Sequence, residues 1–132
     1  MHRRRNAPPD EGFAHAYGAF RQTITHVEEA RRTLAAAAPR GRSAGVPLAE
    51  ALAGFDEEIA AAREAMGGWR VGFVEAEWLA CQGALVEAAR RAEALRLGAA
   101  PQGYEQLYGT LADLMEPLEA FDAAFERFRS GR

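Results

Sequence analysis

Residues 66–74 read Met-Gly-Gly-Trp-Arg-Val-Gly-Phe-Val, and this stretch decides whether the middle of the chain is one long helix or two. Before it, apolar residues recur at alternating steps of three and four. Continuing that phase beyond the glycines soon places polar residues on the stripe, whereas restarting at Val71 gives an apolar series that runs to Leu95. The phase therefore changes at Gly67-Gly68, and we predict a tight reversal between two helices.

The same alternation, with a mean step of 3.5, occurs in four series along the chain. The first two series are Phe13, Tyr17, Phe20, Ile24, Val27, Arg31, Leu34, Ala38, and Leu48, Leu52, Phe55, Ile59, Ala62, Met66, Trp69. The last two are Val71, Val74, Trp78, Cys81, Leu85, Ala88, Ala92, Leu95, and Tyr104, Leu107, Leu111, Leu114, Leu118, Phe121, Phe125, Phe128. Such a stripe keeps one face of each helix against a neighbour. We expect an all-α, up-down-up-down four-helix bundle with coiled-coil-like seams.

Proline and glycine mark the expected ends of these helices, which we place at about 11–38, 47–66, 71–97 and 102–128. Asp10, directly after two prolines, is the expected N-cap of the first helix. Pro117 lies inside the fourth helix and removes one backbone hydrogen bond. Because the apolar series keeps its phase across Pro117, we expect a kink there and not a break.

The N-terminal residues are basic, with Arg3, Arg4 and Arg5 in a row, and no continuous apolar stretch follows them. We predict a disordered arm over 1–9 and one bundle domain over 10–130, with nucleic acid or an acidic partner as the minority role for the arm. No secretory signal or membrane span is expected, so the default location is cytoplasmic, which the single cysteine also fits. The formal net charge of −3 argues against nucleic acid as the main partner.

Aromatic residues gather at one end of the expected bundle. At this end the first helix begins, the chain reverses between the second and third helices, and the fourth helix ends. This end collects Phe13, Tyr17, Phe20, Trp69, Phe73, Trp78, Phe121, Phe125 and Phe128. One interpretation is a core of large side chains. The functional interpretation is a pocket or apolar patch for a hydrophobic ligand or a partner helix, formed by these residues without Phe13. Phe73 favours it most, because it lies outside the third series.

Arg31 is the one charged residue on any of the four series. An unpaired buried arginine is costly, so Arg31 either extends to solvent or meets a carboxylate from another helix. Asp56, Glu57 and Glu87 are the candidate partners. A paired Arg31 would be a buried polar residue that specifies how the helices associate.

Residues suited to catalysis or metal binding are missing from the four series. Di-iron bundles need Glu-x-x-His on two helices, which does not occur here, and the histidines are only His2, His15 and His26. His15 and His26 lie off the first series, as surface histidines do, and Cys81 lies among apolar positions, where a thiol is usually inert. We therefore expect no catalytic residue, no metal and no cofactor.

One short string has a family resemblance. The sequence Arg21-Gln22-Thr23-Ile24-Thr25-His26 resembles the Arg-polar-x-x-x-His motif of HEPN ribonucleases, which are also helical bundles. In that family the motif lies late in the chain, on a helix of the catalytic cleft, whereas here it lies in the first expected helix. The resemblance implies a remote alternative, an RNA-directed enzyme that uses Arg21 and His26.

These patterns favour a non-enzymatic helical bundle that acts through protein–protein contact, as a homo-oligomer or an accessory subunit. The main alternative is a bundle that binds a small hydrophobic ligand at its aromatic end. Four glycines lie inside the expected helices but outside the apolar series: Gly18, Gly54, Gly83 and Gly109. They would let another helix approach closely, and hence favour self-association. The nucleotide bias of a GC-rich genome explains them equally well.

Overall fold

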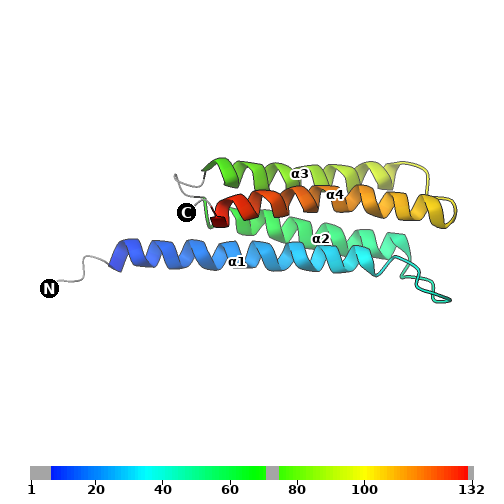
Figure 1. The fold of residues 1–132 in the computed structure, drawn as a ribbon, viewed down its shortest axis with the longest axis horizontal. Coiled ribbons are helices and arrows are strands. Elements are labelled where there is room, and N and C mark those ends of the chain that lie inside the picture. Colours follow the sequence, from blue (N-terminus) through cyan, green and yellow to red (C-terminus); the bar gives the residue numbers. More distant parts are fainter. Residues whose placement is uncertain (1–6, 71–74, 131–132) are drawn as a thin grey trace.

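A computed structural model describes the backbone of residues 7–70 and 75–130, and the side chains of residues 15–70 and 75–127. In these ranges the chain forms four helices and no strand (Figure 1). The helices are α1 (Ala7–Ala35), α2 (Leu48–Met66), α3 (Glu75–Leu97) and α4 (Gly103–Ser130). The expected all-α, four-helix architecture is confirmed.

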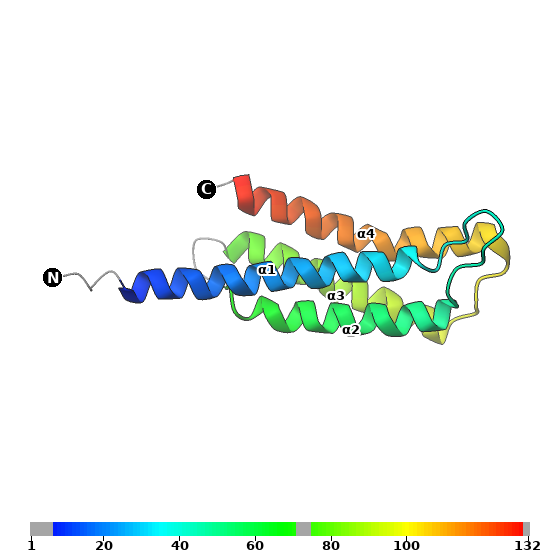
Figure 2. The ribbon, with the colours of Figure 1, turned by 90° about the horizontal axis from the view of Figure 1, so that it is seen from below.

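The four helices lie side by side in both views, and each runs back along the one before it (Figures 1 and 2). The largest contacts join α1 to α2 and α3 to α4, and the contact between α1 and α4 is the smallest of the four neighbouring pairs. The first turns of α1 extend beyond the ends of the other helices (Figure 2). The molecule is thus built from two helical hairpins, of which the first projects at one end.

The core lies between the inner faces of the helices and follows the predicted series on α2, α3 and α4. Its buried members there are Ala51, Leu52, Phe55, Ile59, Ala62, Met66, Trp78, Cys81, Ala84, Leu85, Ala88, Ala92, Leu111, Leu114, Leu118, Phe121 and Ala124. Tyr104 is an exception, because in the first turn of α4 its side chain is 62% exposed. A continuous 3.5-residue stripe is what packing between neighbouring helices requires.

The inner face of α1 differs from the predicted series. Its buried stripe is Phe20, Thr23, Val27, Ala30, Leu34 and Ala37, whereas Ile24, Arg31 and Ala38 are half-buried and Tyr17 is 51% exposed. Phe20, Val27 and Leu34 of the predicted series belong to this buried stripe. The series as a whole is displaced from it toward α4, where Phe20 contacts Phe125 and Arg31 binds Asp122. The other edge carries small alanines, which let α2 approach closely. The face is therefore rotated toward α2, the helix on which α1 packs most.

The ends of α1 also differ from the expectation. The helix begins at Ala7, so Asp10 lies within it and is not the N-cap. Pro8 and Pro9 occupy the first turn, where a missing backbone N–H breaks no helical hydrogen bond. The helix ends at Ala35, three residues before the expected end. In the loop that follows, the Val46 N–H donates a hydrogen bond to the Ala36 carbonyl oxygen at 2.9 Å.

The reversal after α2 occurs where the two glycines predicted it. The helix starts directly after Pro47 and ends at Met66, with Gly67 as its C-cap. A Cβ atom on Gly68 would lie only 2.5 Å from the Cβ of Ala19 in α1, so glycine permits the close approach here. The predicted restart at Val71 lies outside the described residues, in which α3 begins at Glu75.

The fourth helix runs through Pro117 without a break, as predicted, and the kink at that residue stays a prediction. No helix among the described residues has both the length and the apolar character that crossing a membrane requires.

Candidate interaction surfaces

Most of the aromatic side chains that the structure describes at the projecting end of the bundle are buried, and Phe20 joins two of them. The ring of Phe20 lies 4.7 Å from that of Trp69, edge to face, and 5.1 Å from that of Phe125. Phe20, Trp69, Trp78 and Phe121 are all buried. Edge-to-face and offset ring pairs are favourable beyond the area that they bury. These residues therefore hold α1, α3 and α4 to the segment that follows α2.

The indole N–H groups of this cluster have hydrogen-bond acceptors. Trp69 donates from Nε1 to Oγ1 of Thr23 at 3.0 Å, and Trp78 donates from Nε1 to the Met66 carbonyl oxygen at 2.7 Å. The guanidinium of Arg70 lies 4.5 Å above the ring of Trp78. A buried indole N–H usually has an acceptor, because an unpaired buried donor is costly, so both side chains suit a structural role.

The eight residues of the predicted aromatic patch do not form one exposed surface. Four are interior, Phe125 is half-buried and Tyr17 is exposed. Phe73 and the side chain of Phe128 lie outside the described residues. Burial of the central rings favours the interpretation of this end as a packed core.

Two hollows lie toward the opposite end, beside α4. One groove of about 480 Å³ runs between α3 and α4 and includes Arg90, Arg91 and Glu116 in its lining. A second, of about 620 Å³, is lined by the loop after α3 and by α4, and it shares Thr110 and Asp113 with the first. These hollows were not predicted from the sequence. The small residues of the loop after α3 were a signal for the second one, because small side chains leave space beside a helix.

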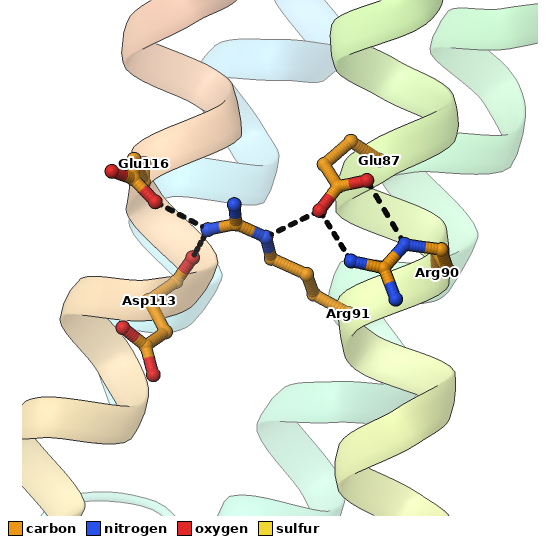
Figure 3. Close-up of polar contacts among 5 residues, drawn as sticks. All are labelled: Glu87, Arg90, Arg91, Asp113 and Glu116. Carbon is orange, nitrogen blue, oxygen red and sulfur yellow. Dashed lines mark hydrogen bonds and ion pairs between the residues drawn. The ribbon is translucent and has the colours of Figure 1, made fainter.

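Arg91 spans the groove between α3 and α4 (Figure 3). It donates from Nε to Glu87 at 2.7 Å, and from Nη1 to the Asp113 carbonyl oxygen at 2.8 Å and to Glu116 at 2.6 Å. Glu87 also accepts two hydrogen bonds from Arg90, at 2.9 and 2.6 Å. The two bonds from Arg90, and then the bond from Arg91, lower the pKa of Glu87 from 4.5 to about 2.

The same cluster does not favour anion binding. Hydrogen bonds to carboxylates raise the pKa of both Arg90 and Arg91. Three acidic side chains, Glu87, Asp113 and Glu116, accompany these two arginines (Figure 3), so the cluster has no excess of positive charge. Its evident role is to hold α3 against α4.

Arg31 meets a carboxylate that the sequence analysis did not name. It donates from Nη2 to Oδ2 of Asp122 in α4 at 2.7 Å, with Glu28 of its own helix 3.8 Å away. Two of the expected partners bind other arginines: Asp56 binds Arg96, and Glu87 binds Arg90 and Arg91. The side chain of Arg31 is 30% exposed, so the pair lies at the edge of the small α1–α4 contact.

The other candidate residues of α1, Arg21, His26 and His15, do not form one site. His26 approaches Glu58 of α2, with 2.7 Å between Nδ1 and Oε1, while Arg21 lies over the ring of Tyr17 at 5.8 Å. The two residues of the HEPN-like string thus have different contacts. His15 is exposed.

Cys81 is buried in the core, where desolvation raises the pKa of its thiol to about 12. A thiol in such surroundings is unreactive at ordinary pH. Across the described residues, no three histidine, cysteine, aspartate or glutamate side chains come together as metal ligands would.

The outward side of α3 carries a second 3.5-residue series, which sequence reasoning missed. We call it the outer α3 stripe: Ala76, Leu79, Gly83, Val86, Arg90, Glu93 and Leu97. At about 100° per residue these positions share one side of the helix, opposite the buried series. Leu79, Val86 and Leu97 are 50%, 41% and 79% exposed. A Cβ atom on Gly83 would have no atom within 4 Å.

No protein-family model, curated protein or solved structure matches this chain. The other large exposed apolar residues in the described part are Tyr17, Tyr104 and Tyr108, and Tyr108 donates its hydroxyl to the Pro39 carbonyl oxygen at 3.1 Å. The outer α3 stripe is distinguished by three exposed aliphatic side chains along one helix face.

Proposed function

We propose that this protein is a non-enzymatic helical bundle that acts by binding another protein, and that the outer α3 stripe is its contact surface. The observation that carries the proposal is the exposure of Leu79, Val86 and Leu97 on one side of a single helix. A surface helix of a globular protein has one apolar side, which faces the core. A second apolar side is typical of a helix that packs on a partner as well.

The inner side of α3 is already fully used. Cys81, Leu85, Ala88 and Ala92 are each 0% exposed, so the core needs no further contribution from the outward side. Packing within one molecule therefore does not explain the outer aliphatic residues. Binding to another protein does, because it would remove their apolar surface from water, which is the main favourable term in association.

The other surfaces give weaker support to the alternative functions. At the aromatic end, Phe20 contacts the rings of Trp69 and Phe125, and four of the described rings are buried, which favours a core over a ligand site. Arg21 and His26 contact a tyrosine of their own helix and a glutamate of α2, respectively, which does not favour joint action on RNA. An oligomeric scaffold or an accessory subunit remains the proposal.

Site-specific photocrosslinking in the native host tests this function. A benzophenone amino acid replaces Val86 in one variant and Leu79 in another, and Glu57, which is exposed on α2, is replaced in the control. We expect one discrete crosslinked product from each α3 variant and none from the control. No discrete product from either α3 position, or the same product from position 57, would overturn the proposal.

A second variant guards against chance proximity. Leu97→Glu changes a residue that is 79% exposed, so the fold should persist with a stability change within about 1 kcal/mol. Crosslinking from position 86 should nevertheless decrease strongly, because a charge then lies in the contact. Circular dichroism confirms the helical fold of this variant, and unchanged crosslinking in a folded variant would contradict the assigned surface.

A further inference from the structure

We infer that the partner of the outer α3 stripe is a second copy of this chain, with α3 antiparallel to the partner's α3 about a two-fold axis. This inference rests on the proposed function, because it names the occupant of the same surface. The order and spacing of four stripe residues favour this arrangement: Val86, Arg90, Glu93 and Leu97.

These four residues form a self-complementary sequence. Their successive spacings are four, three and four residues, which are the same in either direction along the helix. When two such helices lie antiparallel, Val86 stands opposite the partner's Leu97, and Arg90 stands opposite the partner's Glu93. Two-fold symmetry repeats both pairings, so apolar residues meet at each end of the contact and opposite charges meet twice between them.

A parallel arrangement gives the opposite result. In register, it would place Arg90 beside the partner's Arg90 and Glu93 beside the partner's Glu93. Like charges at such a contact are unfavourable and exclude wrong arrangements. The charges therefore specify the antiparallel orientation, while the aliphatic residues supply the apolar contact.

The side chains concerned are accessible. Arg90 and Glu93 have 65% and 57% of their side chains exposed. Arg90 is held by Glu87 of the preceding turn, and Glu93 by Arg96 of the next, so both already lie along the surface of α3. Contacts between copies would add to these local pairs, and their main effect would be on orientation, because exposed ion pairs contribute little affinity.

The contact is short, and this sets the expected strength. The segment from Val86 to Leu97 spans eleven residue steps, or roughly 16 Å of helix at about 1.5 Å per residue. Leu79 lies seven residues before Val86, at the periphery of the pairing. An interface of this length falls in the small class, so the dimer should dissociate on dilution.

Sedimentation equilibrium of the purified full chain over a range of concentrations tests the inference. We expect a reversible monomer–dimer equilibrium for the unchanged chain. Arg90→Glu and Glu93→Arg each place two like-charged pairs in the contact, so each should weaken dimerisation by about tenfold. Arg32→Glu on α1, an equally exposed arginine with a partner three residues away, is the matched control and should dimerise normally.

Mixing the two variants gives the decisive measurement. In a 1:1 mixture, the two acidic positions of Arg90→Glu face the two basic positions of Glu93→Arg, so a heterodimer should form more tightly than either variant forms a dimer alone. The double variant Arg90→Glu/Glu93→Arg should recover dimerisation as well. Recovery of binding in the mixture cannot result from misfolding of either chain.

The outcomes separate the inference from the proposed function. A monomeric unchanged chain at its highest soluble concentration, or a dimer that ignores the charge reversals, overturns antiparallel self-association through α3. If photocrosslinking from position 86 still gives a discrete product with a different protein, the proposed function stands without self-association. If the crosslinked product is a dimer of this chain, both are supported.

Discussion

Trp69 donates a hydrogen bond from its indole Nε1 to Oγ1 of Thr23, over 3.0 Å, inside the bundle. The hydroxyl of Thr23 donates in turn to the Ala19 carbonyl oxygen at 2.9 Å. Thr23 is 0% exposed and is the one buried polar residue among the described side chains. This chain of two hydrogen bonds ties the segment after α2 to α1, and it uses both the donor and an acceptor position of one hydroxyl.

Thr23→Val tests the importance of this hydroxyl. Valine has nearly the shape of threonine but accepts no hydrogen bond, so the indole N–H of Trp69 would be buried without a partner. We expect the free energy of unfolding to fall by about 1–3 kcal/mol. Urea denaturation followed by circular dichroism measures the change.

Thr25→Val is the matched control for this substitution. Thr25 lies on the exposed side of the same helix, two residues further on, and the same chemical change there should alter stability by no more than about 0.5 kcal/mol. Equal losses at the two positions would mean that helix propensity, and not the hydrogen bond to Trp69, determines the effect.

Thr23 also shows why the sequence predicted α1 less well than the other helices. By polarity alone, Ile24 belongs in the core and Thr23 outside it. The structure reverses this, because Thr23 satisfies its hydroxyl internally and Ile24 lies at the edge. In α2, α3 and α4 the large apolar residues fix the phase. Just after the end of α1, Ala37 contributes to the core, but its hydropathy does not distinguish it from the alanines on either side of it.

The candidate surfaces were less predictable than the fold. Arg31 and Asp122 are 91 residues apart in sequence, so no spacing rule joins them. The gathering of rings at one end followed from the order of helices, but whether Phe20 and Trp69 leave a cavity depends on ring orientation. The outer α3 stripe can also be found in the sequence. It was not predicted because the buried series of the same helix was by itself sufficient to predict that helix.

The pair of Arg31 and Asp122 gives a second prediction. It joins α1 to α4 where the contact between helices is smallest, but both side chains are partly exposed, which screens their attraction. A double-mutant cycle with Arg31→Ala and Asp122→Ala should give a coupling energy of about 0.2–1 kcal/mol that decreases in high salt. Urea denaturation at two salt concentrations measures it.

Glu28 provides the comparison for this cycle, since it lies 3.8 Å from Arg31 within α1. Coupling of Arg31 to Glu28→Ala should be smaller than coupling to Asp122→Ala. The reverse order would mean that Arg31 serves its own helix and does not join α1 to α4.

Close approach of α1 at Gly68 gives a third prediction. In Gly68→Ala the added methyl group would lie 2.5 Å from Cβ of Ala19, which forces the two segments apart. We expect a loss of about 1–3 kcal/mol in stability. Adding Ala19→Gly should recover part of that loss. If the two residues were not in contact, the effects of the two substitutions on stability would instead be additive. Thermal unfolding of the two single variants and the double variant measures this.

Gly109→Ala tests the same change where there is space. A Cβ atom on Gly109, inside α4, would meet no atom within 4 Å, so alanine should stabilise the helix by roughly 0.5–1 kcal/mol. If Gly68→Ala were equally stabilising, the tight contact with Ala19 would be refuted.

Glu87 gives a pH-dependent prediction. Hydrogen bonds from Arg90 and then Arg91 lower its pKa from 4.5 to about 2 in the folded protein. A carboxyl group with a lowered folded-state pKa contributes full stability above its unfolded-state pKa, and this contribution is lost as pH falls through the folded-state value. The contribution of Glu87 should therefore be constant above about pH 4.5 and disappear progressively between pH 4.5 and 2.

The difference in stability between the unchanged chain and Glu87→Gln isolates this residue from the other carboxyl groups. Thermal unfolding of both proteins across that pH range should show the unchanged chain as the more stable at neutral pH, with the difference decreasing toward pH 2. Repeating the comparison in an Arg90→Gln background should reduce the pH-dependent part, because Arg90 makes the largest contribution to the lowered pKa. A difference that stays constant with pH would show that Glu87 affects stability through helix propensity, and that its two arginines do not favour its ionised form.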